Sequence, residues 1–146
     1  MRYWDTSGIL ALLLVEDASE EVASLFAADP DIFTWWATRV EAISAIERRA
    51  RTGESAQDEC QLARDRLAEI AARWQEIDPT NEVRVVAEDL LRRHALRAAD
   101  SLQLAAALAT LPHLRASLPF VTLDSRLRRA AGTEGFSVLP REPHRS

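Results

Sequence analysis

The sequence predicts an α/β fold in which a central, mostly parallel sheet of four or five strands is covered by helices on both faces. Short apolar segments with the composition of strands alternate with longer segments of helical periodicity. The expected order is β-α-α-β-α-α-β-α-α-β-α-β, and strands separated by helices pair in parallel. A length of 146 residues and a hydrophobic content of 47% suit one domain. We expect this domain to span residues 1–140, followed by a flexible tail over residues 141–146.

The first half of the chain should contribute two strands and four helices. Asp29-Pro30 should end the second helix, because the residue before a proline avoids helical angles. Thr52-Gly53 should close the third helix, because glycine readily adopts the left-handed conformation found after helices. The expected elements are strand 2–5, helix Thr6–Val15, helix Ser19–Ala28, strand Ile32–Trp35, helix Thr38–Arg51 and helix Ser55–Arg73.

The second half should complete the sheet. Residues Trp74–Asp78 are either a short third strand at the sheet edge or an extension of the preceding helix, and Pro79 forces a break after them. The expected elements that follow are helix Thr80–His94, an alanine-rich helix over 98–110, strand Phe120–Leu123, helix 125–131 and strand Phe136–Leu139.

The basic residues exclude several kinds of chemistry. All 18 are arginine, and the chain contains no lysine. A Walker A loop, a Schiff-base enzyme and the aspartyl-phosphate phosphatases and receiver domains all need a lysine. The net charge of −5 also argues against binding nucleic acid through the overall field. Local arginine clusters could still contact phosphates, or could simply be solvated helix faces; they are Arg48-Arg49-Arg51, Arg92-Arg93-Arg97 and Arg126-Arg128-Arg129.

Cysteine content and the N-terminus predict a cytoplasmic location. Cys60 is the single cysteine and cannot pair within the chain, so a reducing compartment is expected. No signal peptide is expected, because Met1-Arg2 leads directly into a strand, and the apolar run Ile9–Val15 is too short to span a bilayer.

Four acids stand at or near the ends of predicted strands or the starts of predicted helices: Asp5, Glu41, Asp100 and Asp124. Ligands of parallel α/β sheets bind at the carboxyl ends of the strands, where such acids would meet. Clustered carboxylates form a hard oxygen site that suits Mg²⁺ or Mn²⁺ and the hydrolysis of a phosphodiester. The sequence therefore predicts a metal-dependent site at this edge.

Helix capping is the alternative explanation for the same four acids. Asp5 and Asp124 could cap the helices that follow them, and Thr38-Arg39-Val40-Glu41 fits a capping box, as does Asp100-Ser101-Leu102-Gln103. Capping explains Asp100 least well, because the sequence on either side of it offers few polar partners. A buried acid without a partner is costly.

The histidines and Ser7 are weaker candidates for catalytic residues than the four acids. His94, His113 and His144 lie in a helix, a turn and the tail, and none forms a catalytic pattern. Ser7 lacks a base within evident reach and is expected to act as a hydroxyl at a helix start. The four tryptophans, Trp4, Trp35, Trp36 and Trp74, stand on or beside predicted strands and are expected in the core or at an interface.

The chain resembles the PIN-domain ribonucleases over nearly its whole length, and among them the VapC-like toxins of type II toxin–antitoxin modules. Four segments carry the resemblance, and their order and spacing, rather than any single one of them, make it specific. The segments that carry it are Tyr3-Trp4-Asp5-Thr6-Ser7, Val40-Glu41-Ala42-Ile43-Ser44-Ala45-Ile46, the stretch from Leu96 to Ala105 around Asp100, and Val121-Thr122-Leu123-Asp124-Ser125-Arg126-Leu127. Ser101 departs from the pattern, since alanine is common there.

The resemblance implies a PIN-like three-layer α/β/α sandwich and a metal-dependent endoribonuclease. The metal-site acids would carry over to the four acids above, with Asp5, Asp100 and Asp124 as candidate Mg²⁺ or Mn²⁺ ligands. Glu41 would position or deprotonate the attacking water, and Ser7 and Thr122 would be polar neighbours of the site. The reaction would leave a 5′-phosphate and a 3′-hydroxyl.

The resemblance also implies partners. RNA would be the substrate, a small VapB-like antitoxin would neutralise the toxin, and the chain would form a homodimer. Part of the surface at Ile9–Val15 and at the leucines of helix 80–94 would then receive an amphipathic helix of the antitoxin, unless those residues are ordinary core. A catalytically inactive PIN-like interaction module and a non-toxin PIN nuclease of RNA processing stay open as alternatives.

Overall fold

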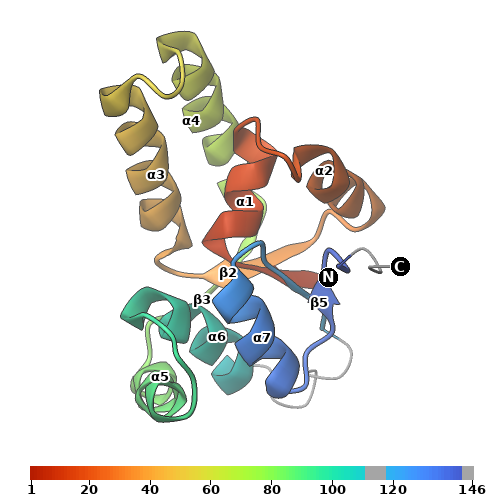
Figure 1. Ribbon diagram of the computed structural model, residues 1–146, viewed down its shortest axis with the longest axis vertical. Coiled ribbons are helices and arrows are strands. Elements are labelled where there is room, and N and C mark those ends of the chain that lie inside the picture. The colour runs from red at the N-terminus through yellow and green to blue at the C-terminus, as the bar shows by residue number, and fades with distance from the viewer. Residues whose placement is uncertain (111–117, 143–146) are drawn as a thin grey trace.

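The computed structural model describes residues 1–110 and 118–142 of the chain. Its elements follow the predicted order closely (Figure 1). They are β1 (Arg2–Trp4), α1 (Thr6–Leu13), α2 (Ser19–Ala28), β2 (Ile32–Trp35), α3 (Thr38–Thr52), α4 (Gln57–Ala71), β3 (Gln75–Ile77), α5 (Asn81–Arg93), α6 (Ala98–Thr110), β4 (Phe120–Val121), α7 (Ser125–Thr133) and β5 (Val138–Leu139).

Within the described residues, five strands form one sheet in the order β3-β2-β1-β4-β5, and every neighbouring pair is parallel. The expected four or five mostly parallel strands are therefore five wholly parallel ones. The segment with two possible structures, Trp74–Asp78, contains the edge strand β3 rather than a continuation of α4.

Helices cover both faces of the sheet. Successive residues of a strand point to opposite faces, so neighbouring residues enter different cores. Tyr3 and Phe120 face a core shared with α5, α6 and α7, while Trp4 and Val121 face a core shared with α1 to α4. The rings of Tyr3 and Phe120 stack with their centroids 4.8 Å apart. This arrangement confirms the predicted α/β/α sandwich.

Several predicted elements differ in length from the observed ones. α1 ends at Leu13 rather than Val15, because Leu14 is extended and its carbonyl accepts a hydrogen bond from the Ser19 hydroxyl at 2.9 Å. The last two strands are two residues each, whereas α7 runs two residues further than expected, to Thr133. Gly53 closes α3 with φ of 72°, as the sequence predicted.

The apolar run Ile9–Val15 is mostly ordinary core and not an exposed surface. Ile9, Leu12 and Leu14 are buried, and α1 packs against α2, α3 and α4. Val15 is the exception, with 91% of its surface exposed. Among the leucines of α5, Leu90 is buried and Leu91 is 42% exposed. The extra apolar surface expected for a partner is thus smaller than the sequence suggested.

Gly8 lets α1 approach the sheet closely. A Cβ at this position would lie 3.2 Å from both the Trp4 ring and a Val121 methyl group, and 3.3 Å from the Val121 carbonyl oxygen. These contacts are tighter than side chains normally make, so glycine allows the start of α1 to lie against β1 and β4.

No helix among the described residues has the length and apolar character needed to cross a membrane.

Candidate active site at the carboxyl edge of the sheet

The connections between strands reverse direction beside β1. From β1 the chain proceeds outward to β2 and β3, and then returns to place β4 and β5 on the other side of β1. Ligands of open parallel sheets bind outside the carboxyl ends of the strands at such a reversal. Asp5 directly follows β1, and Thr122 and Asp124 follow β4. The topology therefore brings predicted site residues from both ends of the chain to one place.

Asp5 lies at the centre of this edge with only 3% of its surface exposed. Its Oδ1 accepts hydrogen bonds from the Gly8 backbone N–H at 2.9 Å and from the Ser7 hydroxyl at 2.7 Å. Its Oδ2 accepts from the Thr122 hydroxyl at 2.7 Å. Asp5 therefore caps α1, as the capping explanation proposed. The polar neighbours Ser7 and Thr122 both contact it.

Backbone amides fix the direction of the two hydroxyls. The Leu123 N–H donates to the Ser7 oxygen at 2.8 Å, and the Asp124 N–H donates to the Thr122 oxygen at 3.1 Å. Each hydroxyl proton is thereby left for Asp5. Three donor protons reach a carboxylate that has about four lone-pair directions, so Asp5 retains the capacity for one further interaction.

Asp124 is the N-cap of α7. Its Oδ1 accepts from the Leu127 N–H at 2.9 Å, as the capping explanation proposed. Capping and participation in a site are compatible, because the cap uses one carboxylate oxygen and leaves the other free of that role.

Glu41 and Asp100, unlike Asp5 and Asp124, do not take part in the capping that the sequence suggested. The N-cap of α3 is Ala37, and no side chain caps that helix, so the predicted Thr38–Glu41 box is wrong. The Thr38 hydroxyl is buried and bonds with Thr34 at 2.7 Å instead. Glu41 accepts a 2.6 Å hydrogen bond from the Thr6 hydroxyl of α1. Asp100 is the third residue of α6 and not its N-cap, so the predicted Asp100–Gln103 box is wrong as well. The backbone of Arg97 hydrogen-bonds to the Asp100 carboxylate.

Electrostatics link the four acids. Burial, with a smaller contribution from the Asp124 charge, raises the pKa of Asp5 to about 6, against the lowering effect of hydrogen bonds from Thr122, Gly8 and Ser7. Burial and then the Asp124 charge raise the pKa of Asp100. Burial also raises the pKa of Glu41, hydrogen bonds from Thr6 and Gln103 oppose this, and the Asp100 charge adds to the rise. Like charges are thus near enough to disfavour one another's ionisation.

Sequence reasoning missed a buried polar network next to these acids. It consists of Tyr3, Thr6, Thr34, Thr38 and Gln103, which hydrogen-bond to one another or to Glu41. The available signal was the position of Gln103, one helical turn after Asp100 and directly before the apolar run from Leu104 to Ala109. A buried amide among Leu104, Ala105 and Ala106 requires hydrogen-bond partners.

The fit of a divalent cation rests on the chemistry of the donors. As they lie, no three Asp, Glu, His or Cys side chains among residues 1–110 and 118–142 form a group that could hold a metal ion. Mg²⁺, however, usually takes one or two carboxylates directly and keeps several waters. Asp5, with its remaining lone pair, and the electrostatically linked Asp100 and Asp124 suit such an ion.

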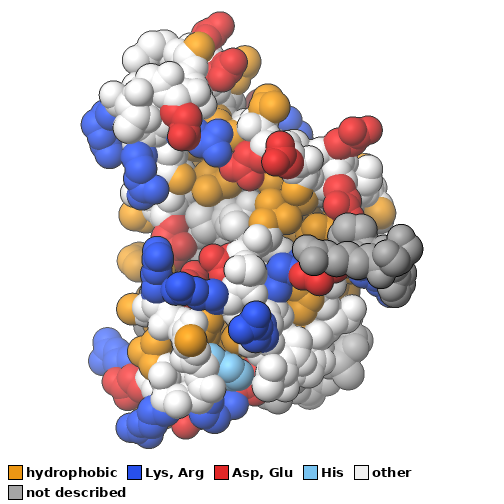
Figure 2. All heavy atoms as spheres, viewed as in Figure 1, with side chains coloured by type: hydrophobic (Ala, Val, Ile, Leu, Met, Phe, Trp, Pro, Cys, Tyr) orange, Lys and Arg blue, Asp and Glu red, His pale blue; other side chains and the backbone are white. Residues whose placement is uncertain are grey.

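Arginines stand close to the acids. The charges of Arg97 and Arg126 lower the pKa of Asp100, against the stronger effect of burial. Figure 2 shows basic and acidic side chains gathered where the α3 side of the molecule meets the α6 and α7 side. Two of the three arginine clusters noted in the sequence thus contribute a member beside Asp100.

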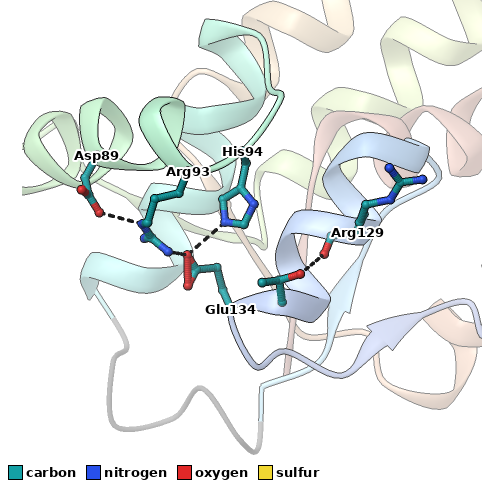
Figure 3. A network of polar contacts seen from close by, with 6 residues as sticks. Asp89, Arg93, His94, Arg129 and Glu134 are labelled. Atoms are coloured by element: carbon teal, nitrogen blue, oxygen red, sulfur yellow. Dashed lines mark hydrogen bonds and ion pairs between the residues drawn. The ribbon is translucent and has the colours of Figure 1, made fainter.

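The described histidine lies in a separate network. His94 follows α5, and its Nε2 lies 3.2 Å from Glu134 Oε1 after α7 (Figure 3). Arg93 also pairs with Glu134, and with Asp89 at 3.0 Å, so these contacts tie α5 to α7. The predicted lack of a catalytic role for His113 and His144 concerns positions outside the described residues. Trp4, Trp35 and Trp74 are buried as expected, whereas Trp36 is 53% exposed.

Solved structures of similar fold cover almost the whole chain. FitAcB from Neisseria gonorrhoeae is 19% identical, with a TM-score of 0.63, over 94% of this chain and 96% of its own. PAE2754 from Pyrobaculum aerophilum is 20% identical, with a TM-score of 0.62, over 94% and 89%. FitAB bound to an IR36 DNA fragment is 18% identical, with a TM-score of 0.64, over 99% of both chains. No curated protein matches the sequence.

The family comparison is more direct than the structural likenesses, which at this identity concern the fold. The model of the PIN domain matches residues 2–133, a range that contains all four acids and the whole of α1 to α7. The chain belongs to the PIN domain family.

Proposed function

We propose that this protein is a metal-dependent endoribonuclease toxin whose activity is held in check by an antitoxin. PIN domains are generally nucleases. The observation that carries the proposal is the electrostatic linkage of Asp5, Glu41, Asp100 and Asp124 at the topological reversal of the sheet. Clustered acids are unfavourable without a cation, which supports a role in binding one.

The residues have distinct roles in this proposal. Asp5 and Asp100 would contact Mg²⁺ or Mn²⁺ directly, and Asp124 would contact it directly or through a water molecule. The ion would supply Lewis acidity toward a phosphodiester and lower the pKa of a bound water. Glu41, partly buried and bonded by Thr6, orients or deprotonates the attacking water. Arg97 and Arg126 contact the phosphates of the RNA, which offsets the repulsion between an acidic protein and its substrate.

A metal titration tests the site without a substrate. We expect Mg²⁺ or Mn²⁺ to raise the melting temperature, by an amount that corresponds to about 2–3 kcal/mol at a hundredfold excess over the dissociation constant. The shift should vanish in the Asp5→Asn/Asp100→Asn double variant. Asp58→Asn, on the exposed first turn of α4, should keep the full shift. An equal shift in the double variant would contradict the assignment of these two acids.

An antitoxin segment has a candidate docking place at the end of α1. Leu13, Leu14 and Val15 line a hollow of about 620 Å³ together with Leu62 of α4, which is 69% exposed. Three acids, Glu59, Asp65 and Glu69, border this hollow together with a single arginine, Arg66. We therefore assign it to an amphipathic antitoxin helix that carries basic residues beside its apolar face. FitAB, of similar fold, is recorded bound to a DNA fragment.

Self-association has a different candidate surface. Trp36, Val40 and Ile43 are 53%, 67% and 41% exposed at the start of α3. These three side chains define the α3 face, and their exposure supports the homodimer that the resemblance implied.

Two matched substitutions separate these surfaces. We expect Leu62→Asp to weaken binding of the antitoxin, the product of the adjacent gene, at least about tenfold and to leave the dimer intact. Val40→Asp should dissociate the dimer and leave antitoxin affinity nearly unchanged. Light scattering and calorimetric titration measure the two outcomes, and each variant is the control for the other. A monomeric parent that ignores the neighbouring product would contradict both assignments.

A further inference from the structure

Gln103 is a fully enclosed amide at the junction of the sheet with the proposed active site. It lies on α6, one turn after Asp100, with 2% of its surface exposed. Its Oε1 accepts from the Tyr3 hydroxyl at 2.6 Å. Its Nε2 lies 3.0 Å from the hydroxyl oxygens of Thr6 and Thr38 and 3.4 Å from Glu41 Oε2. One side chain thus contacts β1, α1 and α3.

Thr6 connects this amide to Glu41. The Thr6 hydroxyl has one proton, and the 2.6 Å contact with Glu41 uses it, because an ionised carboxylate can only accept. Any further hydrogen bond of the Thr6 hydroxyl must therefore be one that its oxygen accepts. The N–H of Gln103 donates such a bond.

The Thr38 contact fixes which end of the amide faces the threonines. Thr34 lies 2.7 Å from the Trp4 carbonyl oxygen, which can only accept, so Thr34 donates to it. The 2.7 Å contact between Thr34 and Thr38 then requires Thr38 to donate. The Thr38 oxygen, like that of Thr6, is left as an acceptor for Gln103. A reversed amide would place its oxygen against two oxygens with no proton to give.

The hydrogen bonds therefore run in one direction, from Tyr3 through Gln103 and Thr6 to Glu41. We propose that Gln103 is a positioning residue for Glu41: its amide keeps the Thr6 hydroxyl pointed at the Glu41 carboxylate and so holds that carboxylate toward the site. The consequence for catalysis rests on the proposed function. The effect on Glu41 itself does not, because it concerns the protein without metal or RNA.

The direct readout is the state of the Glu41 carboxyl, followed by carbon NMR in the metal-free protein over a range of pH. Gln103→Met keeps an unbranched side chain of similar size and removes the donors. Thr6→Val removes the connecting hydroxyl. Both should raise the pKa of Glu41, because hydrogen bonds from Thr6 and Gln103 lower it. The double variant should raise it only slightly more than Thr6→Val alone, because the direct contact from Gln103 to Glu41, at 3.4 Å, is much longer than the 2.6 Å bond from Thr6.

Two further substitutions provide the rescue and the control. Thr6→Ser retains a hydroxyl and should restore the parent pKa of Glu41. Thr34→Val makes the same chemical change as Thr6→Val in the same buried network, but on the branch that ends at Trp4. It should change the pKa of Glu41 much less than Thr6→Val does, because the contact with Thr6 still fixes the Gln103 amide. If Gln103→Met destabilises the fold, Tyr3→Phe/Gln103→Met also removes the tyrosine hydroxyl that would lack an acceptor, and the comparison is made there.

Activity gives the second readout. With RNA and Mg²⁺, Gln103→Met and Thr6→Val should each lower kcat about tenfold or more with little change in KM, whereas Thr34→Val should lower kcat much less. A Glu41 pKa that moves equally in Gln103→Met and Thr34→Val would overturn the positioning role and make Gln103 a purely structural amide. If the parent cleaves no RNA, the proposed function fails, and the NMR comparison still decides the role of Gln103.

Discussion

Replacing Asp5 or Asp100 with asparagine is expected to abolish RNA cleavage and growth toxicity while the chain stays folded. Asparagine nearly preserves shape and keeps an oxygen that can accept from the Gly8 N–H, so the cap of α1 survives the first change. Under the metal proposal each substitution removes a charge that holds the cation. Losing several kcal/mol of transition-state stabilisation corresponds to about a thousandfold loss in rate.

Single-turnover cleavage of a labelled RNA in Mg²⁺, with circular dichroism as the check on folding, measures this effect. Asp58→Asn is the matched control, because it makes the same change on the exposed surface of α4. If both Asp5→Asn and Asp100→Asn cleave like the parent, the four-acid site is wrong and the family membership describes the fold alone.

The stability of the metal-free protein should fall as the pH rises from about 4 to about 6, and Asp5 should be a main cause. Burial raises the pKa of Asp5 from 3.8 in the unfolded chain to about 6 in the folded one. The folded state therefore binds the proton more tightly, so its advantage is fully present below the unfolded pKa and is lost as the pH passes the folded pKa. A shift of this size is equivalent to about 3 kcal/mol.

Urea denaturation at a series of pH values, with chelator present, measures the free energy of unfolding. Asp5→Asn should gain stability relative to the parent across this window, by up to about 3 kcal/mol, and the difference should be flat on either side. Asp58→Asn should follow the parent. The raised pKa values of Glu41 and Asp100 act in the same direction and persist in Asp5→Asn, so the difference isolates Asp5. A difference that does not change with pH would show that Asp5 is not held in a desolvated site.

The sequence predicted those parts of the site that depend on strand ends. Asp5 directly follows β1, and Asp124 is the third residue after the end of β4. Parallel pairing of β1 with β4 then places both acids at one edge of the sheet. Their capping roles were equally predictable, because an N-cap is set by the next three residues.

The parts that failed depend on tertiary contacts. Thr38 matches a capping box locally, yet its hydroxyl bonds with Thr34 and Gln103 in the core. Gln103 meets Tyr3 across 100 residues of sequence, and only the orientation of α6 against β1 brings them together. Likewise, the burial of the apolar run in α1 depends on α2, α3 and α4 covering it together.

The Ser7 hydroxyl donates to Asp5 and accepts from the Leu123 N–H. The second of these bonds joins the two ends of the chain, so the site cannot form during synthesis until Leu123 has been made. The ribosome makes the chain from its N-terminus at about 5–20 residues per second. Asp5 emerges early, but it stays without its Thr122 partner until β4 has been made and has inserted beside β1. A nascent chain that stops before this pairing therefore exposes no assembled site, however well α1 to α4 have folded. An inhibitor that recognises the hollow between α1 and α4 would find its binding surface complete before the acids meet.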